Sequence, residues 1–328
     1  MTPRPAPRVR IVRASAPADD RAAFADDVRR GLTGARKSLP CRWFYDAEGS
    51  RLFDEICTLD EYDILRVETE VLTAHAAEIV RPRPASVVEL GSGSAVKTRI
   101  LLDALHGHPA LYTPIDVSVS ALEASAHELG AAYPSLSIVG VAGTYDDGLR
   151  RLRELAPAPR LVLWLGSNVG NFDRAGAAAF LGTVRRALGA HDRVLMGVEL
   201  RKDAARLHAA YDDARGVTAA FNKNLLARIN RELGGSFDLD DFAHRAVVLD
   251  GPGRVEMHLV ARRAHTVRVA ELDLEVSFAE GESIHTEDST KYSREEIAAL
   301  ARAAGFAVRA LWTDAAGGFA DVILGAAK

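Results

Sequence analysis

The sequence predicts an α/β protein whose core is a parallel, doubly wound β-sheet. Three observations support this fold class. The short run Val87–Leu90, apolar but for one residue, leads into the glycine turn Gly91–Gly93 and then into a helical pattern. Further strand patterns alternate with helical patterns as far as residue 199, which is the spacing of right-handed βαβ units. After residue 200 the alternation stops, which indicates a second part of the chain with mixed helices and strands.

The expected elements of the sheet follow in chain order. Strands are expected at 86–90, 111–115, 136–142, 160–165 and 193–199, with helices between them at 95–106, 120–131, 146–155 and 173–188. Ser94 is expected to cap the first of these helices. A helix with a capping-box start and two strands end the chain, at 293–304, 307–313 and 319–325.

The segments outside this alternation have patterns of their own. Residues 1–19 are rich in proline, alanine and arginine and are expected to form a flexible tail. The segment 37–50 is a loop with several aromatic residues. Further helices are expected at 20–36, 51–59 and 65–80 and as a pair within 201–233, and short strands at 255–261, 266–269 and 274–278.

The composition argues against several classes of protein. The 328 residues are 48% hydrophobic and 26% charged, which suits a soluble protein of one large or two closely associated domains. A net charge of −4 gives no electrostatic footprint for nucleic acid. No apolar run of roughly 18 residues and no signal-peptide core occurs, so we expect a cytoplasmic protein without a membrane partner. Two cysteines and no histidine pair at metal-binding spacing predict no metal site, and we expect a monomer or a weak dimer.

The glycine turn is the first candidate binding site. Free backbone N–H groups of such a turn face the crevice at the carboxyl ends of the strands. The dinucleotide fingerprint is incomplete, because Val96 stands where its third glycine would be, and the phosphate-binding P-loop pattern is absent. The form Glu89-Leu90-Gly91-Ser92-Gly93 is closer to the S-adenosylmethionine (SAM) turn of Rossmann-like methyltransferases. A tight turn with no ligand is the alternative interpretation.

Residues that follow the next strands could serve SAM. Asp116, at the end of the second strand, could accept hydrogen bonds from a ribose diol or could simply cap the next helix. The segment Gly143–Asp146, after the third strand, offers an aromatic face and side-chain oxygens for an adenine ring. Lys97 could bind the SAM carboxylate or could be solvated.

Two other polar segments could bind a second ligand. The segment Gly166–Phe172 follows the fourth strand, and the Asn171 amide within it could hold a carboxylate or an amine. In the polar segment 282–292, Glu287 and Ser289 would share one face of an extended chain, where a carboxylate and a hydroxyl suit a ring that bears N–H groups. The alternatives are an ordinary turn and a solvated loop.

Seven blocks, in order along residues 20–325, resemble the ergothioneine-pathway L-histidine Nα-methyltransferases. They are Lys37–Pro40, Trp43–Asp54, Glu61-Tyr62, Glu89–Gly93, Gly166–Asn171, Tyr211–Asn222 and Thr286–Lys291. The resemblance implies a Rossmann-like, class I SAM-dependent methyltransferase sheet, with its last strand antiparallel, and an inserted α+β substrate-binding domain. It places the substrate-binding domain at 20–65 and 200–291, and the SAM-binding domain at 66–199 and 292–328.

The activity implied by the resemblance is trimethylation of the α-amino group of L-histidine to hercynine (histidine betaine), the first step of ergothioneine biosynthesis. Three SAM molecules would be consumed and no metal would be needed. The residues implied for SAM are Gly91, Ser92, Gly93, Lys97, Asp116, Gly143, Thr144 and Tyr145.

The residues implied for histidine divide by the group that they contact. Asn171 and Tyr211 would hold the carboxylate with Tyr45 beside them, while Tyr62 and Gly166 would contact the amine. Glu287 and Ser289 would read the imidazole, near which Met257 would pack. Tyr62 and Tyr45 are also the candidate catalytic proton acceptors, although water could take that role.

The chain departs from the family pattern at two places. Thr144-Tyr145 stands where the family usually has Asp-Phe, which predicts weaker SAM binding. Asp63 replaces the second tyrosine of a Tyr-Tyr pair and would bring a new charge near the entrance. Two alternatives therefore stay open: a SAM-dependent N-methyltransferase of another amino acid, and a non-catalytic protein that binds an amino acid or SAM.

Overall fold

A computed structural model describes residues 8–14, 17–106 and 111–327. The chain separates into two compact units. The first unit comprises residues 1–14, 64–200 and 292–328, and the second comprises 15–63 and 201–291. The second unit is thus an insertion into the first, and each is described by itself below.

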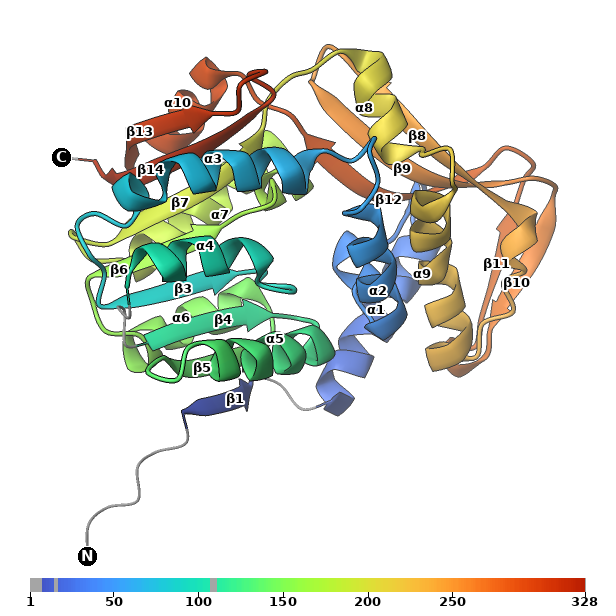
Figure 1. The fold of residues 1–328 in the computed structure, drawn as a ribbon. Helices are drawn as coiled ribbons and strands as arrows, with labels where there is room; N and C mark the ends of the chain where they lie inside the picture. Colours follow the sequence, from blue (N-terminus) through green and yellow to red (C-terminus); the bar gives the residue numbers. More distant parts are fainter. Residues whose placement is uncertain (1–7, 15–16, 107–110, 328) are drawn as a thin grey trace, which may run out of the picture. The chain divides into compact units, whose positions relative to one another are not determined.

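An eight-stranded sheet forms the centre of the first unit (Figure 1). Its strands, in spatial order, are β1 (Val9–Arg13), β5 (Ser137–Ala142), β4 (Leu111–Asp116), β3 (Ser86–Leu90), β6 (Arg160–Trp164), β7 (Arg193–Glu199), β14 (Phe319–Ala326) and β13 (Phe306–Thr313). All pairs are parallel except the two made by β14, which runs antiparallel to β7 and to β13. From β3 the order continues through β4, β5 and β1 on one side and through β6, β7, β14 and β13 on the other. This order confirms the predicted class I methyltransferase fold.

Helices cover both faces of this sheet. Successive residues of a strand point to opposite sides, so a strand of apolar residues presents apolar side chains on both faces. Val87 packs into one apolar core and Val88 into the other. The first core includes α3 (Ile64–Ile79), α4 (Val96–Ala104) and α5 (Val119–Ala132), and the second α6 (Tyr145–Leu155), α7 (Arg174–Ala187) and α10 (Arg294–Ala303). Among the described helices of the chain, none has the length and apolar character needed to cross a membrane.

The prediction of a flexible tail over residues 1–19 is wrong for residues 9–13. These residues form β1, which pairs in parallel with the edge strand β5 from Val9 opposite Ile138 to Arg13 opposite Ala142. The unpaired backbone groups of an edge strand favour such an addition. Ile11 also packs against the core on one face of the sheet. The rest of the predicted tail lies partly in α1 (Pro17–Thr33) and partly outside the described residues.

The second unit combines a four-stranded sheet with helices and a separate hairpin. The sheet order is β2 (Lys37–Ser38), β12 (Ser283–Thr290), β9 (Arg254–Ala261) and β8 (Phe242–Leu249), and the hairpin is β10 (His265–Val269) and β11 (Leu274–Phe278). The helices are α1, α2 (Ala47–Ile56), α8 (Ala204–Tyr211) and α9 (Val217–Leu233). Short 3₁₀ turns in the two units are η1 (Cys41–Phe44), η2 (Asn168–Asn171), η3 (Leu239–Asp241) and η4 (Ala270–Leu272).

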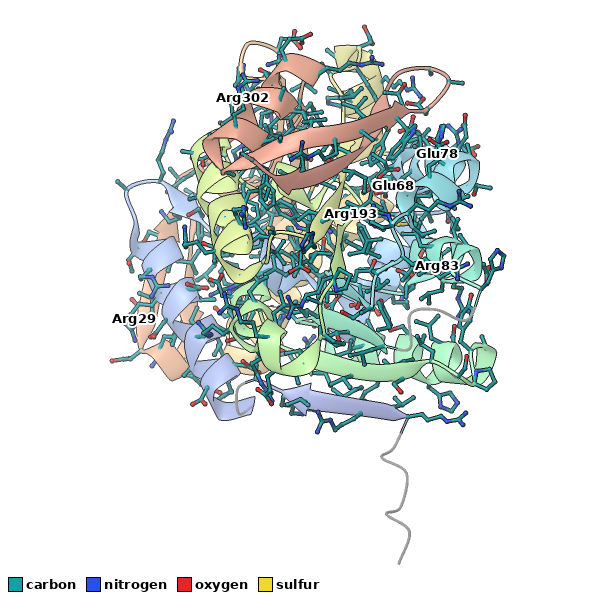
Figure 2. The ribbon with its side chains drawn as sticks, turned by 90° about the vertical axis from the view of Figure 1, so that its left-hand side faces the viewer. Arg29, Glu68, Glu78, Arg83, Arg193 and Arg302 are labelled. Atoms are coloured by element: carbon teal, nitrogen blue, oxygen red, sulfur yellow. The ribbon has the colours of Figure 1, made fainter. Side chains whose placement is uncertain are left out.

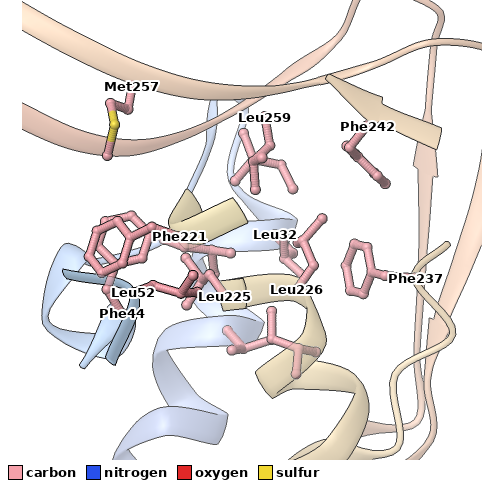
Figure 3. Packing of buried hydrophobic residues seen from close by; sticks show 14 of the residues in the cluster. Leu32, Phe44, Leu52, Phe221, Leu225, Leu226, Phe237, Phe242, Met257 and Leu259 are labelled. Atoms are coloured by element: carbon pink, nitrogen blue, oxygen red, sulfur yellow. The ribbon is translucent and has the colours of Figure 1, made fainter. Parts of the chain in front are cut away.

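The core of the second unit lies between α9 and the inner face of β9 (Figure 3). Phe221 and Leu225 of α9 face Met257 and Leu259, which alternate with half-buried residues along the strand. The Phe44 ring packs against that of Phe221 in a tilted arrangement, with centroids 4.6 Å apart. Each such aromatic side chain contributes on the order of 2–3 kcal/mol by burial, so this packing fixes the strand that carries Met257.

Candidate active site

The predicted glycine turn lies at the carboxyl end of β3 in the first unit. Gly91 and Gly93 have φ values of +76° and +48°, in the left-handed region that favours glycine. A Cβ at position 91 would lie 2.8 Å from the Tyr145 hydroxyl, so a side chain there would collide with it. The Gly91 N–H donates to the Ile115 carbonyl at 2.8 Å, which ties the turn to β4.

Asp116 holds this turn through its carboxylate. One oxygen, Oδ2, accepts from the Gly93 N–H and the other, Oδ1, from the Ser118 N–H, each at 2.8 Å. Asp116 does not cap α5, whose N-cap residue is Ser118. Burial raises the pKa of Asp116, while the hydrogen bonds from backbone N–H groups oppose this effect. Each oxygen keeps acceptor capacity, so the ribose role of Asp116 stays a prediction.

The start of α4 differs from the prediction. Its N-cap residue is Ala95, in the left-handed conformation at φ 54°, and no side chain caps the helix, so the predicted Ser94 cap is wrong. The first-turn N–H groups therefore receive no acceptor from the side chain of the N-cap residue. Within the described residues the buried Ser92 hydroxyl has no hydrogen-bond partner either. Uncapped N–H groups beside an unsatisfied hydroxyl fit a polar ligand at this turn.

Glu89, the acidic residue of the motif, has a structural role. Its carboxylate accepts from the Thr98 hydroxyl at 2.6 Å and from the Tyr112 hydroxyl. Burial raises its pKa to about 7, although these two hydrogen bonds lower it. Glu89 thus joins β3 to α4 and β4 and holds the strand end from which the glycine turn begins.

Lys97 forms an ion pair with Glu68, a residue that sequence reasoning missed. Glu68 belongs to α3 and is labelled in Figure 2. Both Glu68 oxygens also lie 2.9 Å from the Gly166 amide nitrogen, and the Glu68 side chain is fully buried. This carboxylate therefore joins the first helix of the predicted SAM site to the loop after β6. The only sequence signal was a glutamate on the apolar face of the helix, beside Val67 and Val71.

Asp321 of β14 lies near the same carboxylate and is fully buried. Its strand partner is Gly197, where any side chain would overlap the Glu68 carboxylate. Within the described residues neither Asp321 oxygen has a hydrogen-bond partner. Burial, and then the charge of Glu68, raise the pKa of Asp321 well above its usual range, although Lys97 opposes this. The folded state therefore favours the protonated form of Asp321.

We expect Asp321→Asn to raise the free energy of unfolding at pH 8 by about 1–3 kcal/mol. In this variant, folding no longer has to bind a proton at residue 321. Between the unfolded and folded pKa values only the folded protein binds the proton, so the wild type loses stability as pH rises. The gain should therefore shrink toward pH 4, which denaturation by urea at several pH values will measure. The exposed Asp26→Asn is the matched control, and a gain independent of pH would contradict the assignment.

The predicted adenine residues lie at the start of α6. Thr144 is the N-cap residue and forms a capping box with Asp147, to which its hydroxyl donates at 2.7 Å. The Thr144 side chain therefore stabilises the start of α6. The neighbouring Tyr145 ring lies 5.5 Å from that of Phe180. Gly143, before the cap, donates its N–H to the Asp116 carbonyl at 2.9 Å, so the three predicted positions border the Asp116 strand end.

The loop after β6 contains Gly166 and Asn171 in a strained backbone. Gly166 has φ +72°, and Ser167 has φ +58° although it is not glycine. The Ser167 hydroxyl accepts from the Glu199 N–H at 3.0 Å, and the Asn168 amide donates to the Leu165 carbonyl at 2.7 Å. These bonds hold the conformation from which the 3₁₀ turn η2, ending in Asn171, begins.

Of the predicted histidine-binding residues, Gly166 and Asn171 lie in the first unit and the other six in the second. Tyr45 and Tyr62 belong to an aromatic cluster there. The Phe53 ring lies 5.7 Å from that of Tyr45 and 6.2 Å from that of Tyr62, and Phe221 lies 5.8 Å from Tyr45. Aromatic faces of this kind attract cations.

The segment with Glu287 and Ser289 is strand β12, with a bulge between His285 and Glu287. The bulge sets Glu287 opposite Met257 and Ser289 opposite Val255, so both predicted imidazole contacts face the same side as Met257. Burial raises the pKa of Glu287 to about 7, and the charge of Lys291 opposes that rise. The alternative of a solvated loop is wrong for this segment.

Tyr211 ends α8 and lies beside Ser289. Its hydroxyl donates to the Ser289 Oγ at 2.7 Å, and the Lys291 Nζ lies 2.8 Å from both oxygens. The Tyr211 carbonyl is 2.7 Å from the His244 Nε2, whose Nδ1 is 2.9 Å from the Asn222 amide nitrogen. His244, Asn222 and Lys291 were not predicted as site residues. The contacts that join them to Tyr211 or to each other connect residues that are distant in sequence.

The charge of Asp63 is neutralised within the second unit. Lys202 pairs with it at 2.7 Å, and Arg206 pairs with its other oxygen. Burial raises the pKa of Asp63, but these two cations lower it further, so the net shift is downward. The new charge expected at this departure from the family pattern is therefore paired with two cations.

In the part of the chain that the structure describes, one group of three side chains is close enough to share a metal ion: Glu256, His285 and Asp288. Arg254 pairs with both carboxylates, at 3.2 Å from its Nε to Asp288. These groups therefore neutralise each other as an ion-pair network on the outer face of β9 and β12. The prediction of no metal stays a prediction.

Comparison with known proteins decides the family. The model of a family described as "Histidine-specific methyltransferase, SAM-dependent" matches residues 24–326. The chain belongs to this family. It is 47% identical over 300 residues to a histidine N-alpha-methyltransferase of Mycolicibacterium smegmatis, a match that covers 90% of this chain and 93% of that protein. It is 43% identical to the histidine N-alpha-methyltransferase of Mycobacterium tuberculosis, with the same coverage.

Other proteins with lower sequence identity carry names that refer to other substrates. A 4-dimethylallyltryptophan N-methyltransferase of Epichloe festucae is 29% identical over 89% of this chain and 92% of its own. Among solved structures, the sugar N-methyltransferase KedS8 from Streptoalloteichus is 16% identical with a TM-score of 0.41, covering 83% of this chain and 91% of its own. This last likeness is too slight to add to the family assignment.

Proposed function

We propose that this histidine-specific methyltransferase transfers methyl groups from three SAM molecules to the α-amino nitrogen of L-histidine. The product is hercynine, and the reaction is the first step of ergothioneine biosynthesis. The observation that carries the choice of histidine is the carboxylate–hydroxyl pair Glu287 and Ser289 on one face of β12, beside Met257. An imidazole ring has an N–H for the carboxylate and a ring nitrogen for the hydroxyl.

The methyl donor fits the first unit. SAM supplies an electrophilic methyl group on a sulfonium. The turn Gly91–Gly93, with a Ser92 hydroxyl that has no partner among the described residues, would bind it through polar groups. Asp116 would accept from the ribose hydroxyls, and Lys97 would bind the SAM carboxylate. The half-buried Tyr145 ring, with Gly143 and Thr144, would border the adenine.

The chain's main task in the reaction is positioning, together with removal of protons from the amine. A free α-amine is mostly protonated at neutral pH, and desolvation or a nearby cation favours its neutral form. Tyr62 and Tyr45 would accept or relay the proton, and their aromatic cluster would attract the growing cation. The trimethylated nitrogen has no proton left to lose, which ends the series.

Recognition of the amino acid backbone is assigned to the remaining residues. Asn171 would bind the carboxylate, and Gly166 and Tyr62 would contact the amine. Tyr211 would share the carboxylate only if its proton leaves Ser289, because a phenol has one proton to donate. We further propose a cytoplasmic monomer or weak dimer that needs no metal, since SAM already carries its own leaving group.

Mass spectrometry of an assay with SAM and a panel of amino acids tests the function. We expect one, two and three methyl additions to histidine in sequence, with tryptophan, tyrosine and other amino acids methylated at least about 100-fold more slowly. A reaction inhibited by S-adenosylhomocysteine is the control for the donor. Methylation of another amino acid but not histidine would favour the first alternative above. Histidine binding by calorimetry without any methylation would favour a binding protein.

A further inference from the structure

Lys291 is a fully buried lysine that the proposed reaction does not use. It follows β12, and its backbone N–H donates to the Gly253 carbonyl at 2.7 Å. Its relative exposure is 0%. Its Nζ lies 2.8 Å from both the Tyr211 and Ser289 hydroxyl oxygens and 4.6 Å from the centroid of the Tyr211 ring. A lysine is rarely buried to this extent without a specific reason.

The hydrogen-bond capacities of these three groups determine the direction of each bond. An ammonium group has three donors and no acceptor, so both hydroxyl oxygens must accept from Lys291. The Tyr211 hydroxyl then donates to the Ser289 Oγ. The Ser289 oxygen therefore accepts twice, which occupies both of its lone pairs. Its own proton must be donated to a group other than Tyr211 and Lys291.

Glu287 provides the opposite hydrogen-bonding character two residues earlier on the same strand face. An ionised carboxylate only accepts, whereas Ser289 as bonded here only donates. A neutral imidazole presents one N–H donor and one nitrogen acceptor. An imidazolium presents two donors, and a pyrrole or indole ring presents one donor and no nitrogen acceptor. Of these rings, the neutral imidazole alone satisfies both groups.

We propose that Lys291 is a positioning residue that makes the Ser289 hydroxyl a fixed donor, so that the site reads a neutral imidazole through Glu287 and Ser289 together. This inference rests on the proposed function and deepens it. It assigns substrate selectivity to a residue that need not touch the substrate. Without Lys291 the Ser289 oxygen regains a lone pair, and the hydroxyl can turn to accept as well as donate.

The test compares substrates that differ by one ring atom. The 2-pyrrolyl and 3-pyrrolyl analogues of L-histidine each keep one of the two ring nitrogens as N–H and replace the other by C–H. The analogue that presents its N–H to Glu287 leaves the Ser289 donor unpaired in the wild type. We expect kcat/KM for that analogue to be at least about 10-fold below the value for histidine.

In Lys291→Met we expect this discrimination to fall to within about 2-fold, because the Ser289 hydroxyl can turn away from the ring. Ser289→Ala should relax it equally. Lys291→Arg keeps a donor-only cation and should retain the wild-type ratio. An equal loss of kcat/KM on both substrates in Lys291→Met, with the ratio unchanged, would overturn the proposal and leave Lys291 a purely structural residue.

Two further measurements keep the outcomes distinct. If Lys291→Met does not fold, Lys291→Gln replaces it, since an amide oxygen can accept the Ser289 proton; the ratio should then fall with Gln, and an unchanged ratio again overturns the proposal. Wild-type enzyme that fails to methylate histidine would instead contradict the proposed function. Normal histidine methylation with no discrimination between histidine and either analogue would contradict the inference alone.

Discussion

Glu287→Ala is expected to lower kcat/KM for histidine about 100-fold, the largest loss among the substrate-binding residues. A charge-assisted hydrogen bond contributes about 1.5–3 kcal/mol, and its loss would leave the imidazole N–H without an acceptor. The same change should relax selectivity toward other aromatic amino acids, because no buried carboxylate then remains unpaired in their presence. Steady-state kinetics on histidine and tryptophan measure both effects.

Titration gives this prediction a second readout. Burial raises the pKa of Glu287 to about 7, so its carboxylate form is complete only above that pH and is lost as pH falls through it. Lys291, Asp288 and His285 act on the same charge. The ratio of kcat/KM between wild type and Glu287→Gln should therefore rise with pH through about 7 and then level off. Ionisation of the substrate amine affects both enzymes and cancels in the ratio.

The exposed Glu275→Ala, on β11 of the same unit, is the matched control and should behave as wild type. An unchanged kcat/KM on histidine for Glu287→Ala would remove Glu287 from the binding site. A pH-independent ratio with a lower rate would keep Glu287 in the site but contradict its titration near neutrality.

The strands of the sheet in the first unit could be predicted because the sequence signal of each strand is local. Buried parallel strands such as β3 are short apolar runs, and each is followed by a turn and an amphipathic helix, so a window of residues contains the whole signal. Glu68 carries no such signal, since its partners, Lys97 and Gly166, lie elsewhere in the chain. A lone glutamate on an apolar helix face indicates a buried partner but does not identify it.

Strands with polar residues were harder to predict than apolar ones. The sequence of β12 is mostly polar and was compatible with a loop; pairing with β9 and the bulge after His285 make it a strand. The short strand β1, with the sequence Val-Arg-Ile-Val-Arg, was obscured by the composition of the terminal segment. In both cases tertiary pairing overrides local propensity, and the pattern of a single segment cannot show this.

Resemblance and geometry contributed different parts of the site. The motif Thr286–Lys291 drew attention to Glu287 and Ser289, but the lysine at its end had no assigned role. The Tyr211–Ser289–Lys291 triad joins α8 to the end of β12, and its bond directions depend on three side chains meeting. A sequence shows that such residues are present, whereas donor and acceptor directions require coordinates.

Asp116→Ala is the second change with a large expected effect, and it should act on SAM rather than on histidine. The carboxylate accepts the Gly93 and Ser118 N–H groups at 2.8 Å each. Alanine would leave both without their acceptor and would also remove the proposed ribose contact. We expect KM for SAM to rise at least about 100-fold and the free energy of unfolding to fall by about 2–4 kcal/mol.

These two effects separate the structural and the binding role of Asp116. Asp116→Asn keeps one oxygen acceptor for a backbone N–H, so it should recover much of the stability lost by alanine. Its amide can still bond a ribose hydroxyl, but without the charge, so KM for SAM should stay about 10-fold above wild type. Thermal unfolding measures the stability, and steady-state kinetics with SAM as the varied substrate measure KM, so the two quantities are obtained independently.

The exposed Glu123→Ala, on the helix that follows Asp116, is the control for a change in this region and should alter neither quantity. If Asp116→Asn restores stability and SAM affinity together, the carboxylate serves only to hold the turn. If stability recovers and affinity does not, Asp116 contacts the donor directly. Asp116 would then both hold the conformation of the turn at Gly91–Gly93 and bind the ligand of that turn. One carboxylate can do both, because it accepts backbone N–H groups and still has lone pairs for a ribose.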